Sequence, residues 1–119
     1  NLLGVMTKIK DDNTGTINAD GSISKVATQN DLRKLQEGHD ISKRILLEAG
    51  VREQSIFVTK PRGSHPGGTA AIGEVVNSDL KTEIENLNVC DASVLPVSSG
   101  APHIVTIVSL AKRLAKHLR

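Results

Sequence analysis

The chain has 119 residues, of which 38% are hydrophobic and 24% are charged, and these values are typical of one ordinary globular unit. A net charge of +2 is too small to indicate a nucleic-acid partner, and no apolar run approaches the roughly 18 residues that cross a membrane. The single cysteine, Cys90, cannot form an internal disulfide, which favours a cytoplasmic location. Because Asn1 is not a natural start, we expect a piece of a longer protein.

Residues 2–27 are predicted to form extended segments joined by turns. Turn-forming residues are dense at 11–15 and again at 19–21, and an extended pattern resumes after each turn. We expect a β-meander with a structural role only.

A helix is predicted from Thr28 to Gly50. Thr28 and Asp31 have the spacing of a capping box, and Gly50 supplies the stop. Its apolar residues lie on two faces, one with Leu32, Leu35 and Leu46 and the other with Ile41 and Ile45. The helix is therefore expected either to contact neighbours on both sides or to change direction at Gly38. A short strand is predicted at 55–60.

His65 follows that strand and begins the run His-Pro-Gly-Gly-Thr. Proline fixes a backbone angle, and paired glycines permit close approach of the main chain to a flat ligand or conformations closed to other residues. An imidazole can be a neutral proton acceptor at working pH. The run is either a turn with an incidental histidine or a catalytic or substrate-binding loop.

Residues 87–94 are predicted as an apolar strand interrupted by Asp91, which either lies near the strand end and accepts hydrogen bonds or caps the next turn. Residues 104–118 give the clearest helix. Its apolar stripe comprises Ile104, Ile107, Val108, Ala111, Leu114, Ala115 and Leu118. The free amide groups at its start, after His103, suit developing negative charge.

Three linked motifs, at 65–69, 89–96 and 100–107, resemble the C-terminal signature of the glucose-methanol-choline (GMC) oxidoreductases. The resemblance implies FAD and oxidation of an alcohol by hydride transfer to the flavin, while a histidine takes the hydroxyl proton. It implies catalytic roles for His65 and His103. Cofactor contacts are implied for Asp91, Ala92, Pro102, His103, Ile104 and Thr106.

The chain departs from that signature in the loop before the last helix. The family usually has Asn or His directly before a position often filled by proline, but alignment on Gly100 and Thr106 puts Pro102 at the first position, with His103 after it. Either the loop shifts by one residue so that His103 serves, or His65 works with a substitute from elsewhere.

The expected class is α+β: an antiparallel sheet with a packed helix from a substrate domain (residues 1–64), then a strand and long helix that complete a flavin-binding domain (residues 65–119). The chain lacks a Gly-x-Gly-x-x-Gly motif and a metal-ligand cluster. The resemblance implies an N-terminal FAD-binding domain and a small alcohol as partners, and charge and hydropathy give no indication of nucleic acid or a membrane. The chain alone is expected to be inactive and able to self-associate. Two alternatives are a stand-alone binding module and a complete small non-flavin enzyme.

Overall fold

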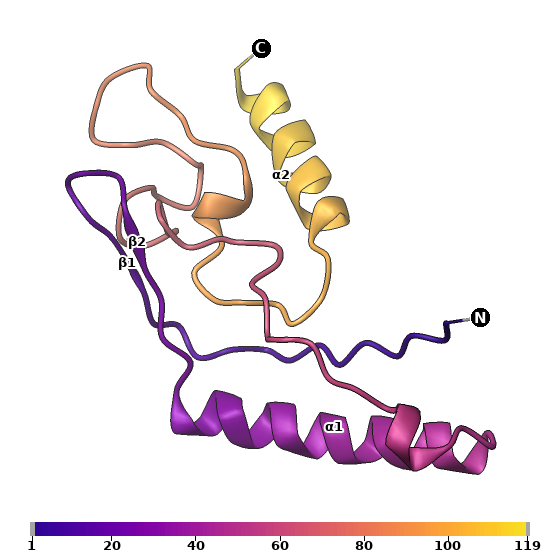
Figure 1. Cartoon of the computed structure of the whole chain (residues 1–119). Coiled ribbons are helices and arrows are strands. Elements are labelled where there is room, and N and C mark those ends of the chain that lie inside the picture. Colours follow the sequence, from indigo (N-terminus) through magenta and orange to yellow (C-terminus); the bar gives the residue numbers. More distant parts are fainter. Residues whose placement is uncertain (1, 119) are drawn as a thin grey trace.

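The computed structural model describes residues 2–118, which form an α+β arrangement with two α-helices and a two-stranded antiparallel sheet (Figure 1). The sheet pairs β1 (Thr16–Ile17) with β2 (Ile23–Ser24). The helices are α1 (Gln29–Glu48) and α2 (Ile104–His117). Asn1 and Arg119, the outer bounds of the two predicted segments, lie outside the described residues.

The predicted meander is reduced to a single short hairpin. Its turn is closed by the Asn18 N–H, which donates to the Ser22 carbonyl at 2.8 Å. The two isoleucines of its strands are exposed, so the hairpin buries little apolar surface. The predicted turn at 19–21 is confirmed as the turn of this hairpin, but the prediction of further paired strands in residues 2–27 is wrong.

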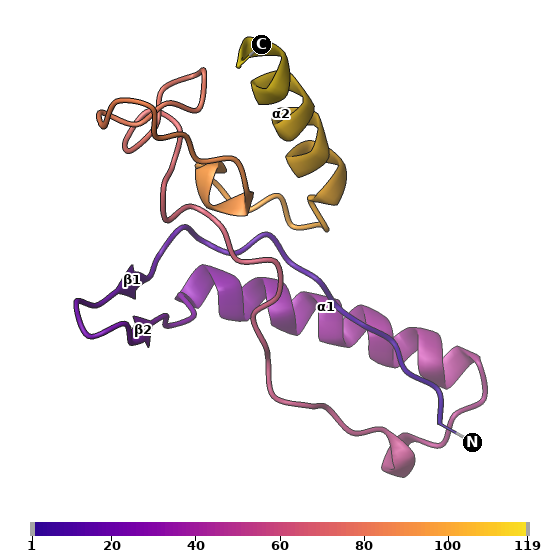
Figure 2. The same ribbon diagram turned by 90° about the horizontal axis from the view of Figure 1, so that it is seen from above.

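Helix α1 begins and ends as predicted. The Thr28 hydroxyl accepts from the Asp31 N–H, the Asp31 carboxylate accepts from the Thr28 N–H, and Gly50 adopts a positive φ of 83° after the last turn. The helix runs without a break through Gly38, so the predicted change of direction there is wrong. A Cβ at Gly38 would overlap the Thr7 side chain. The glycine therefore lets residues 2–10 lie along the helix (Figure 2).

The strand predicted at 55–60 is not formed, and the strand predicted at 87–94 is reduced to one antiparallel bridge between Asn88 and Lys81. Residues 53–55 and 92–94 form short 3₁₀ turns. A strand requires a neighbour for its backbone groups. Residues 92–95 instead accept from a loop: the Ala70 N–H donates to the Ser93 carbonyl and the Ile72 N–H to the Val94 carbonyl, both at 3.0 Å.

A small core holds the C-terminal half together. Val76, Leu80 and Val94 are buried, and Leu110 and Leu114 of α2 pack against them. Of the predicted apolar stripe of α2, Leu114 packs on this core, whereas Ile104 and Val108 remain exposed, as does Val105 outside the stripe. The core covers one side of α2 and leaves its other apolar side open.

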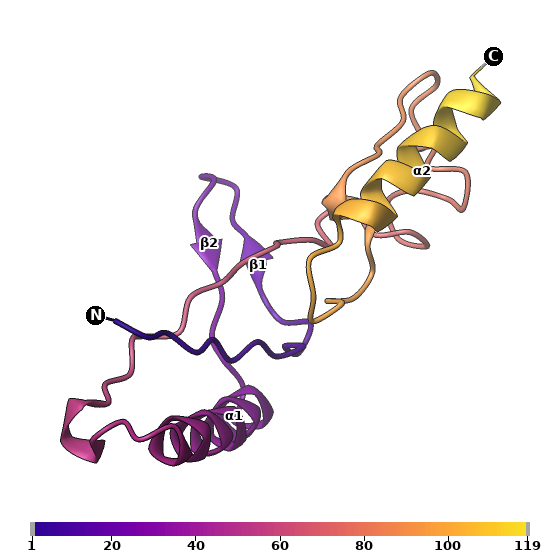
Figure 3. The same cartoon turned by 90° about the vertical axis from the view of Figure 1, so that its right-hand side faces the viewer.

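The molecule is long and open. Its radius of gyration is 18.8 Å, whereas a compact chain of this length has about 13 to 14 Å. Its accessible surface is 9372 Å², against about 6,200 Å² for a folded monomer of its mass. Figure 3 shows α1 and α2 at opposite ends. Much of the surface that a self-contained domain would bury is uncovered.

Within residues 2–118, neither helix combines the length and the apolar character that crossing a membrane requires.

Candidate functional site

The two histidines predicted to be catalytic lie side by side. The ring centroids of His65 and His103 are 5.5 Å apart, and the ring planes meet at 72°, an edge-to-face arrangement. His103 is only 8% exposed, whereas His65 is exposed. The pair therefore presents one sheltered imidazole and one that solutes can reach.

The loop that carries His65 is held by the chain's own backbone. His65 has a positive φ of 58°, which is uncommon for a residue other than glycine. Two residues on, a Cβ at Gly67 would lie 2.7 Å from the Ala92 carbonyl oxygen. The main chain thus approaches a neighbour closely at Gly67, as predicted, but this neighbour is the 3₁₀ turn at 92–94 and not a ligand. Gly68 supplies the second predicted property, a positive φ of 88°.

The hydrogen bonds around His103 assign its tautomer. The Ser99 hydroxyl donates to the Ala101 carbonyl at 2.6 Å and lies 3.3 Å from His103 Nδ1. Because its hydrogen is directed to Ala101, the Ser99 Oγ accepts from His103. In the neutral ring this arrangement places the hydrogen of His103 on Nδ1 and leaves the lone pair on Nε2.

His103 also marks the start of α2, where backbone donors remain free. No side chain of the described residues caps this helix, and the first bond within it runs from the Ile107 N–H to the His103 carbonyl at 3.0 Å. The N–H groups of the first turn, through Thr106, lack helical partners and give this end a partial positive charge. Pro102, Ile104 and Thr106 are exposed around it.

Lys8 is a member of this site that sequence analysis missed. Its Nζ lies 3.2 Å from His65 Nε2, and the two residues are 57 positions apart. An ammonium group can only donate, so Nε2 accepts and His65 carries its own hydrogen on Nδ1. No local motif marks Lys8. The packing of residues 2–10 on α1, through Thr7 and Gly38, helps to place the segment that carries Lys8.

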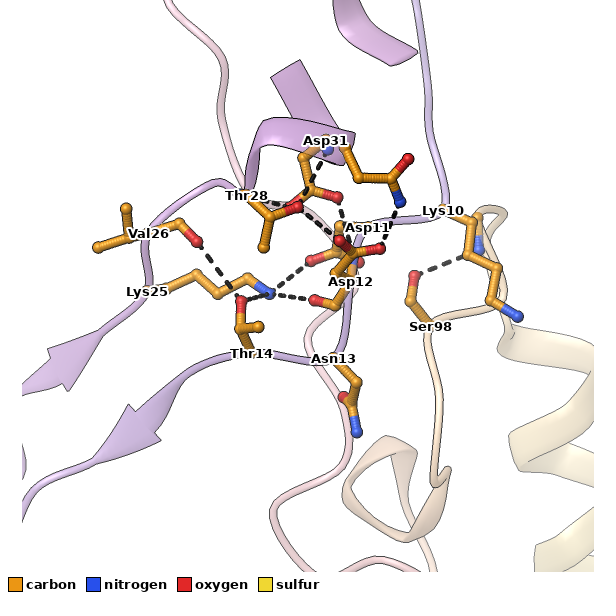
Figure 4. Close-up of polar contacts among 12 residues, drawn as sticks. Lys10, Asp11, Asp12, Asn13, Thr14, Lys25, Val26, Thr28, Asp31 and Ser98 are labelled. Carbon is orange, nitrogen blue, oxygen red and sulfur yellow. Dashed lines mark hydrogen bonds and ion pairs between the residues drawn. The ribbon is translucent and has the colours of Figure 1, made fainter. Parts of the chain in front are cut away.

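A polar cluster fixes the end of that N-terminal segment. We call it the aspartate node, formed by Asp11, Asp12 and Asp31 (Figure 4). The Asp12 N–H donates to Asp31 Oδ1 at 2.8 Å, and Lys25 pairs with Asp11 at 2.8 Å. Asp31 is 2% exposed. The node therefore joins residues 10–14, the base of the hairpin and the start of α1.

The carboxylates of the node are satisfied and structural. The N–H of Thr28, followed by that of Asp12, lowers the pKa of Asp31 below its ordinary value. The Lys25 ammonium lowers the pKa of Asp11. Within residues 2–118 no group of histidine, cysteine or acidic side chains is arranged to hold a metal ion. The node also lies next to the His103 loop, since a Cβ at Gly100 would lie 3.1 Å from the Lys10 Cβ.

Asp91 caps a turn, which confirms the second of the two alternatives for this residue. Its Oδ1 accepts from the Ser93 N–H at 2.7 Å, and it precedes the 3₁₀ turn at 92–94. The Ser93 hydroxyl, followed by that N–H, lowers the pKa of Asp91. Asp91 is exposed. Ala92 begins the turn, and its carbonyl oxygen is the atom that lies against Gly67.

Residues 10–111 match the family model described as GMC oxidoreductase. The chain belongs to the GMC oxidoreductase family.

Two curated proteins are similar to this chain. An uncharacterized protein of Methanocaldococcus jannaschii is 36% identical over 117 residues, which are 98% of this chain and 30% of that protein. The Drosophila melanogaster protein named neither inactivation nor afterpotential protein G is 51% identical over 53 residues, 43% of this chain and 9% of that protein. The chain thus spans less than a third of the length of either relative. No solved structure matches it.

Proposed function

We propose that this chain is the C-terminal portion of an FAD-dependent enzyme that oxidises the CH–OH group of a small alcohol. Residues 1–64 would belong to its substrate domain and residues 65–119 to its flavin-binding part. The observation that carries the proposal is the pairing of His65 with His103 at 5.5 Å, in a chain of the GMC family. Two imidazoles at one place provide the proton acceptor that oxidation of an alcohol requires.

The residues around the start of α2 fit one end of FAD. The free first-turn N–H groups suit the flavin-ring edge that becomes negative on reduction, and Pro102, His103, Ile104 and Thr106 would hold that edge. Ile104 and Val105 are 69% and 75% exposed and offer apolar surface next to it. When bound, FAD supplies the acceptor for the hydride that leaves the alcohol carbon.

The nucleotide end of FAD does not fit this chain. Pyrophosphate is held by a glycine-rich turn at a helix start, and the sequence lacks the Gly-x-Gly-x-x-Gly motif that forms one. Asp91 and Ala92 would contribute only minor contacts next to the pyrophosphate. We therefore propose that an N-terminal FAD-binding domain completes the site and that this chain alone is inactive. The cytoplasmic location inferred from the lone Cys90 stays a prediction.

In the proposed reaction His65 takes the hydroxyl proton. Its Nε2 holds a lone pair and lies on the exposed side of the pair, where an alcohol can displace the Lys8 ammonium from it. Ser99 holds His103 through Nδ1, which leaves the Nε2 of His103 available to substrate. His103 would also cover one side of the space next to His65 Nε2. His103 would position the alcohol and stabilise the charge that develops, with a smaller share of the proton transfer.

Flavin reduction by substrate, followed by stopped-flow absorbance in the full-length protein, tests this assignment. We expect His65→Ala to slow flavin reduction by about 10²- to 10⁴-fold, with little change in substrate affinity. His103→Ala should have a smaller effect. His117→Ala is the matched control, because His117 lies exposed in the last turn of α2. Wild-type reduction rates in both site variants would overturn the proposal, and a larger loss in His103→Ala would exchange the two roles.

A further inference from the structure

We propose that Lys8 makes this site selective for alcohols that carry an anionic group, a carboxylate or a phosphate, next to the carbinol carbon. The inference rests on the proposed function, because the anion would belong to the alcohol that His65 deprotonates. It starts from the 3.2 Å contact between Lys8 Nζ and His65 Nε2. The contact puts a cation beside the nitrogen that would take the hydroxyl proton.

Within residues 2–118, no carboxylate forms an ion pair with Lys8. The ion pairs among residues 2–118 use other cations, namely Lys25, Arg33, Lys34, Lys43 and Arg113. The hydrogen-bond partner of Lys8 is instead an imidazole nitrogen, and the lysine is exposed to incoming solutes. A charge-assisted bond to an anion is stronger than a bond to a neutral acceptor. An anionic substrate therefore gains an interaction that a neutral alcohol does not.

The position of Lys8 is set by contacts on both sides of it. On one side, Thr7 packs on Gly38 and its hydroxyl meets the Ser42 hydroxyl at 3.2 Å. On the other side, the Lys10 carbonyl accepts from Lys34 at 2.9 Å. The backbone that carries Lys8 is thus attached to α1 before and after the lysine. The cation is presented by a fixed segment instead of a free terminus.

The geometry suits an anion and a hydroxyl on neighbouring atoms. The ammonium and Nε2 are one hydrogen-bond length apart, so one small molecule can contact both. A 2-hydroxy acid, or a hydroxyl compound with a nearby phosphate, has this spacing. Binding would replace the Lys8–His65 bond by two bonds, from Lys8 to the anion and from the hydroxyl to His65.

Histidine NMR in the full-length protein tests the inference without turnover or flavin. The ring nitrogens of ¹⁵N-labelled His65 are followed while acetate, inorganic phosphate or neutral ethylene glycol is added. We expect acetate or phosphate to shift the His65 signals with saturation, and ethylene glycol to bind far more weakly. The anion that saturates the shift at the lower concentration tells whether a carboxylate or a phosphate is preferred. Lys8→Met should weaken anion binding roughly 10-fold or more, whereas Lys8→Arg should retain most of it.

The matched control is Lys116→Met, which removes an exposed lysine from the last turn of α2 and should bind as wild type. Equal anion affinity in wild type and Lys8→Met would overturn the inference, as would shifts that never saturate. The proposed function fails separately. If the histidine variants reduce flavin normally but Lys8→Met loses the anion, only the catalytic assignment falls. If flavin reduction depends on His65 and anion binding ignores Lys8, only the present inference falls.

Discussion

At the scale of single residues, His65 occupies a backbone conformation that its surroundings enforce. A left-handed φ on a non-glycine residue costs on the order of 1 kcal/mol or more, and such residues concentrate at functional sites. Here the cost is offset by the loop's bonds to residues 92–95, which begin with the Ala70 N–H on the Ser93 carbonyl. The histidine pair therefore depends on backbone packing as well as on the two side chains.

Gly67→Ala tests that dependence. The added Cβ would lie 2.7 Å from the Ala92 carbonyl oxygen, so the loop must move. We expect a loss of about 1 to 3 kcal/mol in the free energy of unfolding, as for other overpacked sites, together with loss of the nuclear Overhauser contact between the His65 and His103 rings. Gly63→Ala is the control, since nothing lies within 4 Å of its Cβ position. Equal urea midpoints and an intact ring contact in both variants would contradict the account.

Local sequence could predict two of the candidate site residues but not the third. His65 and His103 could be predicted because each lies in a motif with its own turn-forming neighbours. His103 lies next to His65 while Pro102 is exposed, and which residue serves as the second catalytic group stays a prediction. Lys8 could not be predicted, because its place at the site comes from the packing of Thr7 on Gly38.

At the scale of elements, Gly38 joins the N-terminal segment to α1. Glycine inside a helix costs about 1 kcal/mol relative to alanine, and here it gives the Thr7 side chain room against the helix backbone. The same packing holds Lys8 near His65. A residue that weakens the helix thus serves the contact between two elements.

Gly38→Ala should separate these effects. We expect α1 to become more helical by circular dichroism, while trypsin cleaves faster after Lys8 and Lys10 because residues 2–10 lose their place on the helix. Adding Thr7→Ser should restore resistance in part, since it removes the overlapping Cγ2 and keeps the hydroxyl that meets Ser42. Unchanged cleavage in Gly38→Ala would show that the segment is held by other contacts.

The helices and the short hairpin could be predicted from sequence, but the full strands predicted at 55–60 and 87–94 are not formed, for a physical reason. Thr28, Asp31 and Gly50 define the ends of α1 through bonds within a few residues. A strand is stabilised by a partner that can be far away in sequence. Residues 55–60 have strand-forming side chains, but no described residue pairs with them as a strand.

At the scale of the whole molecule, the uncovered surface is the main feature that composition did not predict. The hydrophobic fraction is ordinary, yet among residues 2–118 only Ala71, Val76, Leu80 and Val94 are buried hydrophobic residues. Composition counts apolar residues, but it does not report what covers them. The open side of α2 at Ile104, Val105 and Val108 is where we expect the proposed N-terminal domain to pack, and in its absence this side favours self-association.

The central claim is that this chain supplies the histidine pair of a flavin site and lacks the glycine-rich turn that binds the pyrophosphate of FAD. Titrating FAD with the chain alone, and following flavin fluorescence, tests it most directly. The account predicts weak binding or none, with no saturation in the sub-micromolar range, because the pyrophosphate contacts are missing. Tight, saturable binding of FAD below one micromolar by the isolated chain would contradict it.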